Sequence, residues 1–210
     1  MDNPVTDVQR NAIMSVLHEA MRVLGDNTPL RQDDSRFGRI RWVKKSPFSE
    51  YGDIYSFDND SIPESEIKIR TIDDPLDDSD DRAKVRIVPA SFELYFYVAV
   101  RGITPSMLKE QLDLADYWID GDGEKHQYND MGPGTQPMPR LHRYRYRANA
   151  RSASQFPVDV ELSYGDGPEN APSGTLPSLG IVDIRRAYPL LTPQMRKKKR
   201  EEGAARARGL

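Results

Sequence analysis

The sequence contains no cysteine and only three histidines, and these two absences remove several kinds of chemistry. A chain without cysteine has no disulfide, no thiolate zinc site and no cysteine nucleophile, and its composition suits a reducing compartment. Three histidines (His18, His126 and His142) are too few for a histidine-rich metal site. We therefore expect neither a bound metal nor a cofactor.

Long apolar runs are also missing, and hydrophobic residues make up only 37% of the 210 residues. No run reaches the roughly 18 residues that a membrane-spanning helix needs. The first ten residues have neither the basic start nor the apolar stretch of a signal peptide. The glycine-rich signatures of P-loop and Rossmann sites and the nucleophile elbow of α/β hydrolases are absent as well. The sequence therefore predicts no membrane span and none of these common catalytic motifs.

The net charge of −3 conceals an uneven distribution along the chain. Residues 26–81 carry 15 acidic and 8 basic side chains, whereas residues 185–210 carry 9 basic and 2 acidic ones. An acidic half and a basic tail in one chain favour pairing between copies or with partners. The alternative is a solvated acidic loop and a solvated basic tail.

Two segments show the 3.6-residue periodicity of amphipathic helices. The first spans 6–24 and begins with a capping box formed by Thr6 and Gln9. The second spans 104–119, with Thr104 as the cap and a proline at the first helical position. In this second segment the apolar stripe comprises Leu108, Leu112, Ala115 and Ile119.

The clearest strand is 92–101, in which a fully apolar face alternates with a half-polar, aromatic face. Its predicted buried side chains are Phe92, Leu94, Phe96, Val98 and Val100. Shorter strands are expected at 39–44, 54–57, 66–72, 85–88 (stopped by Pro89), 141–147, 158–164 and 181–186.

The order of these elements is helix, strands, helix, strands and arm, which predicts an α+β fold. We expect one domain over residues 1–190, with a mainly antiparallel sheet packed by the two amphipathic helices. Long loops are expected at 73–82, 120–140 and 165–180, where Asp, Pro, Gly and Ser gather. Residues 191–210 should form a basic C-terminal arm, with a short helix after Thr192 that frays beyond residue 200.

A ladder of arginines and tyrosines is the first candidate for nucleic-acid binding. Guanidinium groups suit phosphates and tyrosine rings suit base stacking. Asp159 and Glu161 alternate in the same way on a nearby strand, so ion pairs across the strands are the favoured alternative. The ladder residues are Arg143, Tyr144, Arg145, Tyr146 and Arg147.

A run of five cations in the arm is the candidate surface for binding a partner. Such a run can bind a phosphate backbone or the acidic region of a neighbouring copy. The residues are Arg196, Lys197, Lys198, Lys199 and Arg200.

One catalytic alternative resembles the Mg²⁺-dependent nucleases of the PD-(D/E)xK type. It would use Glu19 on the first helix, Asp53 before a strand, and Glu66 and Lys68 on the next strand. The resemblance implies that the carboxylates hold Mg²⁺ and that the lysine orients the attacking water. The alternative is that these are polar residues on the solvent face of strands, and we expect no enzyme.

The organisation of the chain resembles that of the small neck, tail-terminator and adaptor proteins of tailed bacteriophages. The resemblance rests on the capped helix 6–24, the strand 92–101 leading into the helix 104–119, the loop 131–140 and the basic arm 193–210. It implies a structural subunit of the virion, assembled in the host cytoplasm. Such subunits form rings, commonly hexamers, that contact neighbouring structural proteins and, in passing, DNA.

Overall fold

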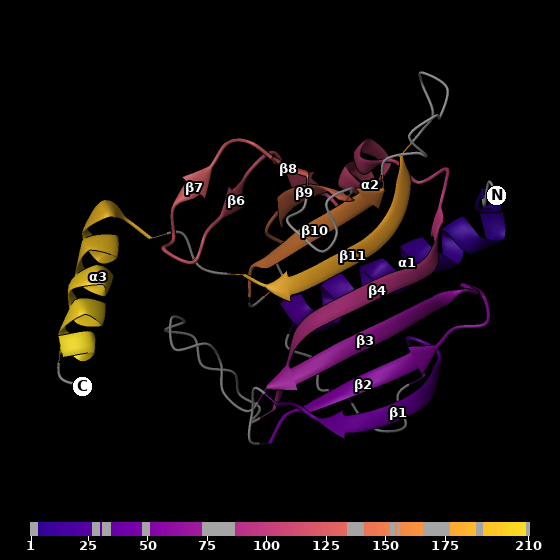
Figure 1. Cartoon of the computed structure of the whole chain (residues 1–210), viewed down its shortest axis with the longest axis horizontal. Helices are drawn as coiled ribbons and strands as arrows, with labels where there is room; N and C mark the ends of the chain where they lie inside the picture. Colours follow the sequence, from indigo (N-terminus) through magenta and orange to yellow (C-terminus); the bar gives the residue numbers. More distant parts are fainter. Residues whose placement is uncertain are drawn as a thin grey trace.

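A computed structural model describes residues 4–26, 30, 35–47, 51–72, 87–133, 141–151, 154, 156–165, 177–187 and 191–208. Helices and a mostly antiparallel sheet form the predicted α+β fold (Figure 1). The predicted loop at 73–82 and most of the one at 165–180 lie outside the described residues.

The main sheet has nine strands and brings distant parts of the chain together. Eight of them follow the order β1-β2-β3-β4-β11-β10-β9-β5, and β8 also pairs with β9. The bounds are β1 Arg39–Lys45, β2 Asp53–Asp58, β3 Ser65–Ile72, β4 Val88–Val100, β5 Leu114–Ala115, β8 Asp130–Pro133, β9 Leu141–Ala148, β10 Val158–Gly165 and β11 Ser178–Arg186. A separate hairpin pairs β6 (Trp118–Ile119) with β7 (Lys125–His126).

Helix α1 (Asp7–Gly25) packs on one face of this sheet and supplies much of the core. The predicted capping box is confirmed, because the Gln9 amide donates to Thr6 Oγ1 and the Thr6 amide donates to the Gln9 side chain. Leu17 and Leu24 are fully buried against strand residues such as Phe92. In Figure 1 α1 lies behind β4 and β11, so the face toward the viewer is the one that α1 leaves uncovered.

The second helix is shorter than its periodicity predicts, because α2 spans only Pro105–Gln111. The chain turns at Asp113, which has a positive φ of 54°, and then pairs as β5 with β9. Asn149 fixes this turn, since its amide donates to the Asp113 carbonyl (2.9 Å) and its Nδ2 donates to Asp113 Oδ1 (2.7 Å). The prediction of a helix to residue 119 was wrong because these long-range bonds prevail over the local apolar stripe.

Two strand predictions also need correction. Strand β4 runs through Pro89 from Val88, and Pro89 lies opposite Thr71 beside a register shift in β3. A bulge accommodates a proline that cannot donate a ladder bond. Val98 is 47% exposed rather than buried, because the pairing of β4 with β11 shifts register between Leu179 and Ile181.

The predicted loop at 120–140 contains β7 and β8 as far as Pro133, so the prediction of a continuous loop was wrong there; residues 134–140 lie outside the described residues. The arm also differs from expectation, since helix α3 runs from Pro193 to Arg208 and does not stop near residue 200. Thr192 caps it as predicted, with Oγ1 accepting from the Met195 amide at 3.3 Å.

Candidate functional site

The arginine ladder is neutralised by the neighbouring strand. The register of β9 and β10 places Arg145 opposite Glu161 and Arg147 opposite Asp159. Arg145 Nη2 lies 2.6 Å from Glu161 Oε2, Arg143 Nη1 lies 3.7 Å from Glu161 Oε1, and Arg147 binds Asp159 through Nε and Nη2. These are the cross-strand ion pairs that the alternating pattern predicts.

The tyrosines of the ladder point to the opposite side of the sheet, into or against the core. Tyr146 is 6% exposed, and burial raises its pKa to about 12. Tyr144 is partly buried and meets Tyr164 edge-on at 6.0 Å between ring centroids. These rings are packed within the protein, so they do not form the stacking platform that nucleic-acid binding by the ladder would need.

The four residues of the nuclease alternative do not come together. Glu66 and Lys68 pair at 2.9 Å on the uncovered face of the sheet, because the alternate residues Ile67 and Ile69 fill the core beneath α1. Glu19 lies on α1, on the other side of the sheet. No group of three or more potential metal ligands occurs within the described residues.

The two remaining carboxylates of that alternative have partners of their own. Asp53 pairs with Lys45 at 2.9 Å. Glu19 accepts from Arg22 (2.7 Å) and from Arg36 (3.0 Å), and the hydrogen bond from Arg22 holds the pKa of Glu19 below its usual value. Each carboxylate therefore has an ion-pair partner in its own part of the fold.

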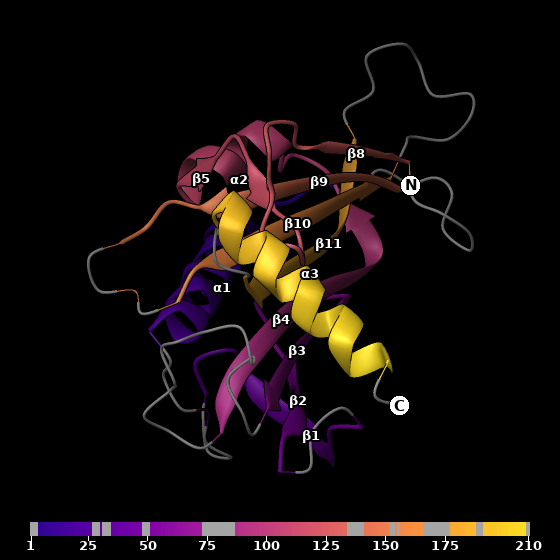
Figure 2. The ribbon, with the colours of Figure 1, turned by 90° about the vertical axis from the view of Figure 1, so that its left-hand side faces the viewer.

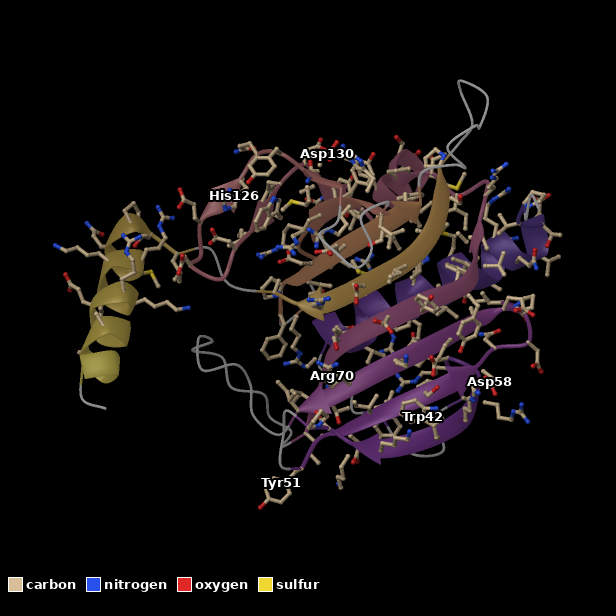
Figure 3. All side chains as sticks on the ribbon, viewed as in Figure 1. Trp42, Tyr51, Asp58, Arg70, His126 and Asp130 are labelled. Carbon is tan, nitrogen blue, oxygen red and sulfur yellow. The ribbon has the colours of Figure 1, made fainter. Side chains whose placement is uncertain are left out.

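Three carboxylates stand side by side on the uncovered face, which carries polar side chains across the sheet (Figure 3). Glu93, Asp183 and Glu161 are direct neighbours on β4, β11 and β10. Burial raises the pKa of Asp183, Arg185 opposes the shift, and the charges of Glu93 and Glu161 add to it. Ionisation of Asp183 is therefore less favourable in the folded protein than in the unfolded chain.

We expect Asp183→Asn to raise the free energy of unfolding at pH 7 by up to about 1 kcal/mol, since like charges opposite each other destabilise a sheet. A carboxyl group whose folded pKa is raised costs stability above that pKa and costs nothing below its unfolded pKa. The gain in unfolding free energy should therefore disappear as the pH falls below the ordinary pKa of an aspartate. Urea unfolding of both proteins at several pH values measures it, and a loss of stability at pH 7 would contradict the prediction.

The hairpin of β6 and β7 is stiffened by Asp120 and by stacked rings. Asp120 Oδ1 accepts from the amides of Asp122 (3.0 Å) and Glu124 (2.8 Å), while Oδ2 lies 2.8 Å from His126 Nε2. The His126 ring stacks on Trp118 with 4.3 Å between centroids, and the Arg145 guanidinium lies 4.7 Å from the centre of the Trp118 ring. The hairpin is thereby tied to the edge of the main sheet.

This hairpin holds the base of the arm. Gly123 has a positive φ of 76°, and Leu191 covers the space where its side chain would be. The Leu191 amide donates to the Gly123 carbonyl (3.1 Å), and Lys199 Nζ lies 3.2 Å from the Gly121 carbonyl. From this base α3 extends away from the sheet (Figures 1 and 2).

The five cations predicted to bind a partner all lie on α3, where they have two roles. Arg196 and Lys199 bond to backbone carbonyls at the base. Lys197 and Lys198 are more than 70% exposed and have only loose pairs, at 3.9 and 3.7 Å, with glutamates one turn later. Arg200 is also exposed. The outer cations of α3 therefore face solvent.

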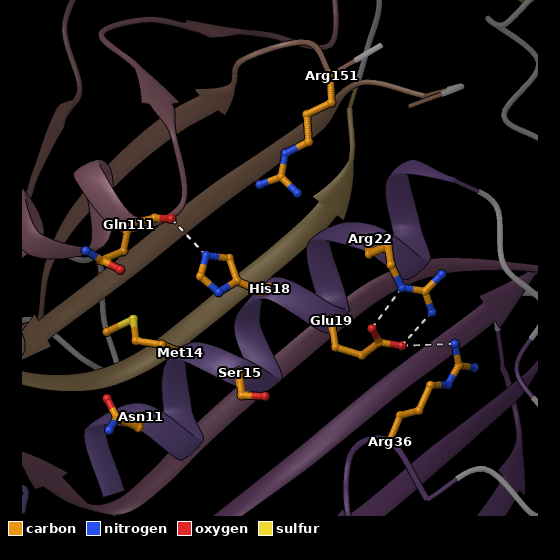
Figure 4. A pocket seen from close by; sticks show the side chains of 9 residues that line it. All are labelled: Asn11, Met14, Ser15, His18, Glu19, Arg22, Arg36, Gln111 and Arg151. Carbon is orange, nitrogen blue, oxygen red and sulfur yellow. Dashed lines mark hydrogen bonds and ion pairs between the residues drawn. The ribbon is translucent and has the colours of Figure 1, made fainter. Parts of the chain in front are cut away.

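A hollow of about 880 Å³ lies on the outer side of α1 (Figure 4). Periodicity places its exposed α1 residues on one stripe opposite the buried one, with the buried Met14 at the edge of that stripe. Residues from three other segments complete it: Arg36 before β1, Gln111 at the end of α2, and Arg151 after β9. Sequence reasoning missed this site, because only the i,i+3 pair of Glu19 and Arg22 is visible in the sequence. The residues from α1 are Asn11, Met14, Ser15, His18, Glu19 and Arg22.

No protein-family model matches the chain, and no significant match was found among curated proteins or solved structures. Among the described residues, no helix has the length and apolar character needed to cross a membrane.

Proposed function

We propose that the protein is a structural subunit of a symmetric assembly, in which copies of the chain form a ring through their C-terminal arms. The neck, tail-terminator and adaptor proteins of tailed bacteriophages are the class that this organisation resembles, which makes the virion the proposed location. The observation that carries the proposal is α3, a 16-residue helix attached at its base and extending away from the sheet.

The composition of α3 supports a role in contacts between chains. Among the described side chains of α3, most are charged or polar and the one large apolar side chain, Met195, is exposed, so no apolar stripe packs the helix onto its own sheet. Most of the stability of helices in proteins comes from packing of an apolar face against the rest of the fold, and α3 has no such face. A partner that covers α3 would therefore stabilise it.

The same chain carries an acidic surface that suits this basic helix. Residues 109–130 hold seven acidic and two basic side chains, and they span the end of α2 and the β6–β7 hairpin. Most of these carboxylates are exposed. The exposed acidic residues are Glu110, Asp113, Asp116, Asp122, Glu124 and Asp130.

The basic helix α3 of one copy can bind the acidic residues 109–130 of the next copy. Two different surface patches then meet at each interface. Such head-to-tail contacts form closed rings when the rotation between copies closes. Among the described residues, nucleic-acid binding would also have to use the arm, because the arginines of the ladder are already paired within the protein. Self-assembly is favoured because the complementary surface lies on the chain itself.

The test is the oligomeric mass of the full chain and of the triple variant Lys197→Gln, Lys198→Gln and Arg200→Gln. Glutamine preserves helix propensity while removing three exposed charges. Size-exclusion chromatography with light scattering should give a multiple of 23.9 kDa for the unchanged chain and mainly 23.9 kDa for the variant. Added salt should weaken the assembly, because exposed charges are screened.

The matched control removes three exposed cations from β1 by Arg39→Gln, Arg41→Gln and Lys44→Gln. This protein should keep the mass of the unchanged chain. A monomeric full chain at every concentration, or an arm variant that assembles like the control, would refute the proposal.

A further inference from the structure

The hollow on the outer side of α1 has the donors of an anion site. Three of its lining side chains are arginines and one is a glutamate, which gives a formal charge of +2 with His18 neutral. The arginines come from three separate segments of the chain, so the fold gathers like charges at one place. Guanidinium groups that converge on one place suit an oxyanion, because their planar donors match its oxygens.

Glu19 fixes two of these guanidinium groups. It accepts from Arg22 Nη2 at 2.7 Å and from Arg36 Nη1 at 3.0 Å, so one carboxylate orients two cations (Figure 4). Side chains that are already held lose less conformational freedom when a ligand binds. Arg22 and Arg36 therefore form a preorganised wall of the hollow.

Arg151 enters from the opposite wall. Figure 4 shows its guanidinium directed into the hollow, toward the side where His18 stands. Within the described part of the chain, the side chain of Arg151 has no ion pair or hydrogen bond. Its five donors are available to an anion in the hollow.

His18 supplies a further polar group with a defined orientation. Its Nε2 lies 2.8 Å from the Gln111 carbonyl, and Nε2 must donate because a carbonyl oxygen only accepts. This carbonyl belongs to the last turn of α2, where helix carbonyls lack partners within the helix. The bond holds the ring in place as part of the wall, and a neutral His18 then has no hydrogen on Nδ1, so the arginines are the donors for an anion.

We propose that this hollow binds a small molecule through a phosphate or pyrophosphate group. A carboxylate offers two oxygens in one plane and a single charge, whereas a phosphate offers three oxygens and up to two charges to donors that converge from several sides. Arg22, Arg36 and Arg151 approach from two walls, which fits a phosphate better. A volume near 880 Å³ lies within the range of ligand pockets, so space remains beside Asn11 and Ser15 for the rest of the molecule.

Calorimetric titration of the full chain with inorganic pyrophosphate at low salt tests this site. Arg151→Gln should raise the dissociation constant at least about tenfold, as expected for losing a hydrogen bond to a charged group. Arg39→Gln is the matched control, since Arg39 is exposed on β1, pairs with Asp58 and does not line the hollow. Thermal unfolding should show that both variants remain folded.

Three results would overturn the proposal. The first is no binding of pyrophosphate by the unchanged chain at about 1 mM. The second is an equal dissociation constant for Arg151→Gln and Arg39→Gln, which would assign the binding to cations elsewhere, such as those of α3. The third is equally tight binding of malonate, which would assign the site to carboxylates. None of these depends on whether the chain forms rings.

Discussion

Replacing Asp159 by asparagine should lower the free energy of unfolding by about 3 kcal/mol, because removal of one partner of a buried ion pair leaves the other charge uncompensated. The Arg147 side chain is 6% exposed and binds the Asp159 carboxylate through two nitrogens. Asparagine keeps the shape of aspartate and removes the negative charge. Urea unfolding followed by circular dichroism measures the change.

The matched control is Asp58→Asn. Its partner Arg39 is 79% exposed at a distance of 3.6 Å, so we expect a change of no more than about 1 kcal/mol. Equal effects of the two substitutions would show that the buried pair is no more important than the exposed one. The double variant Arg147→Met, Asp159→Leu should recover much of the lost stability, because apolar residues can replace a buried ion pair.

The second large effect is expected at Phe92, where substitution by alanine should cost about 4 kcal/mol of unfolding free energy. Phe92 is fully buried in β4, between β3 and β11, and its ring lies 5.8 Å from that of Phe37. Alanine removes the ring and leaves a cavity that the rigid sheet cannot close.

Tyr97→Ala provides the comparison on the same strand. Tyr97 is 51% exposed and contacts Tyr95 on the polar face, so its loss should change stability by less than about 1 kcal/mol. The difference between the two variants, measured by denaturant unfolding, reports which face of β4 carries the core. Similar costs for both would contradict the assignment of the two faces.

The features that the sequence predicts well are those that depend on neighbouring residues. The capping box of α1 needs only Thr6 and Gln9, and its buried stripe follows from periodicity. The ion pairs of the ladder were anticipated because alternation places Arg145 and Glu161 on corresponding faces of adjacent strands. In each case a local rule is sufficient.

The features that the sequence does not predict depend on distant partners. Helix α2 ends early because Asn149, 36 residues later, fixes the turn at Asp113. The hairpin at 118–126 depends on ring stacking and on hydrogen bonds to Asp120. Neither can be recognised in the sequence, because the composition of this segment is typical of a loop. The hollow gathers Arg36, which precedes β1, and Arg151, which follows β9, and no spacing in the sequence brings them together.

The position of β11 in the sheet has a consequence for how the chain folds. Residues 178–186 lie between β4 and β10, so the first four strands have no bonded neighbour on the β4 side until this late segment has been synthesised. During synthesis β4 is therefore an exposed edge that can pair with other chains. Pairing between segments this far apart also slows folding, because a long loop must close first. The two halves of the sheet consequently fold as one unit, late, around a single central strand.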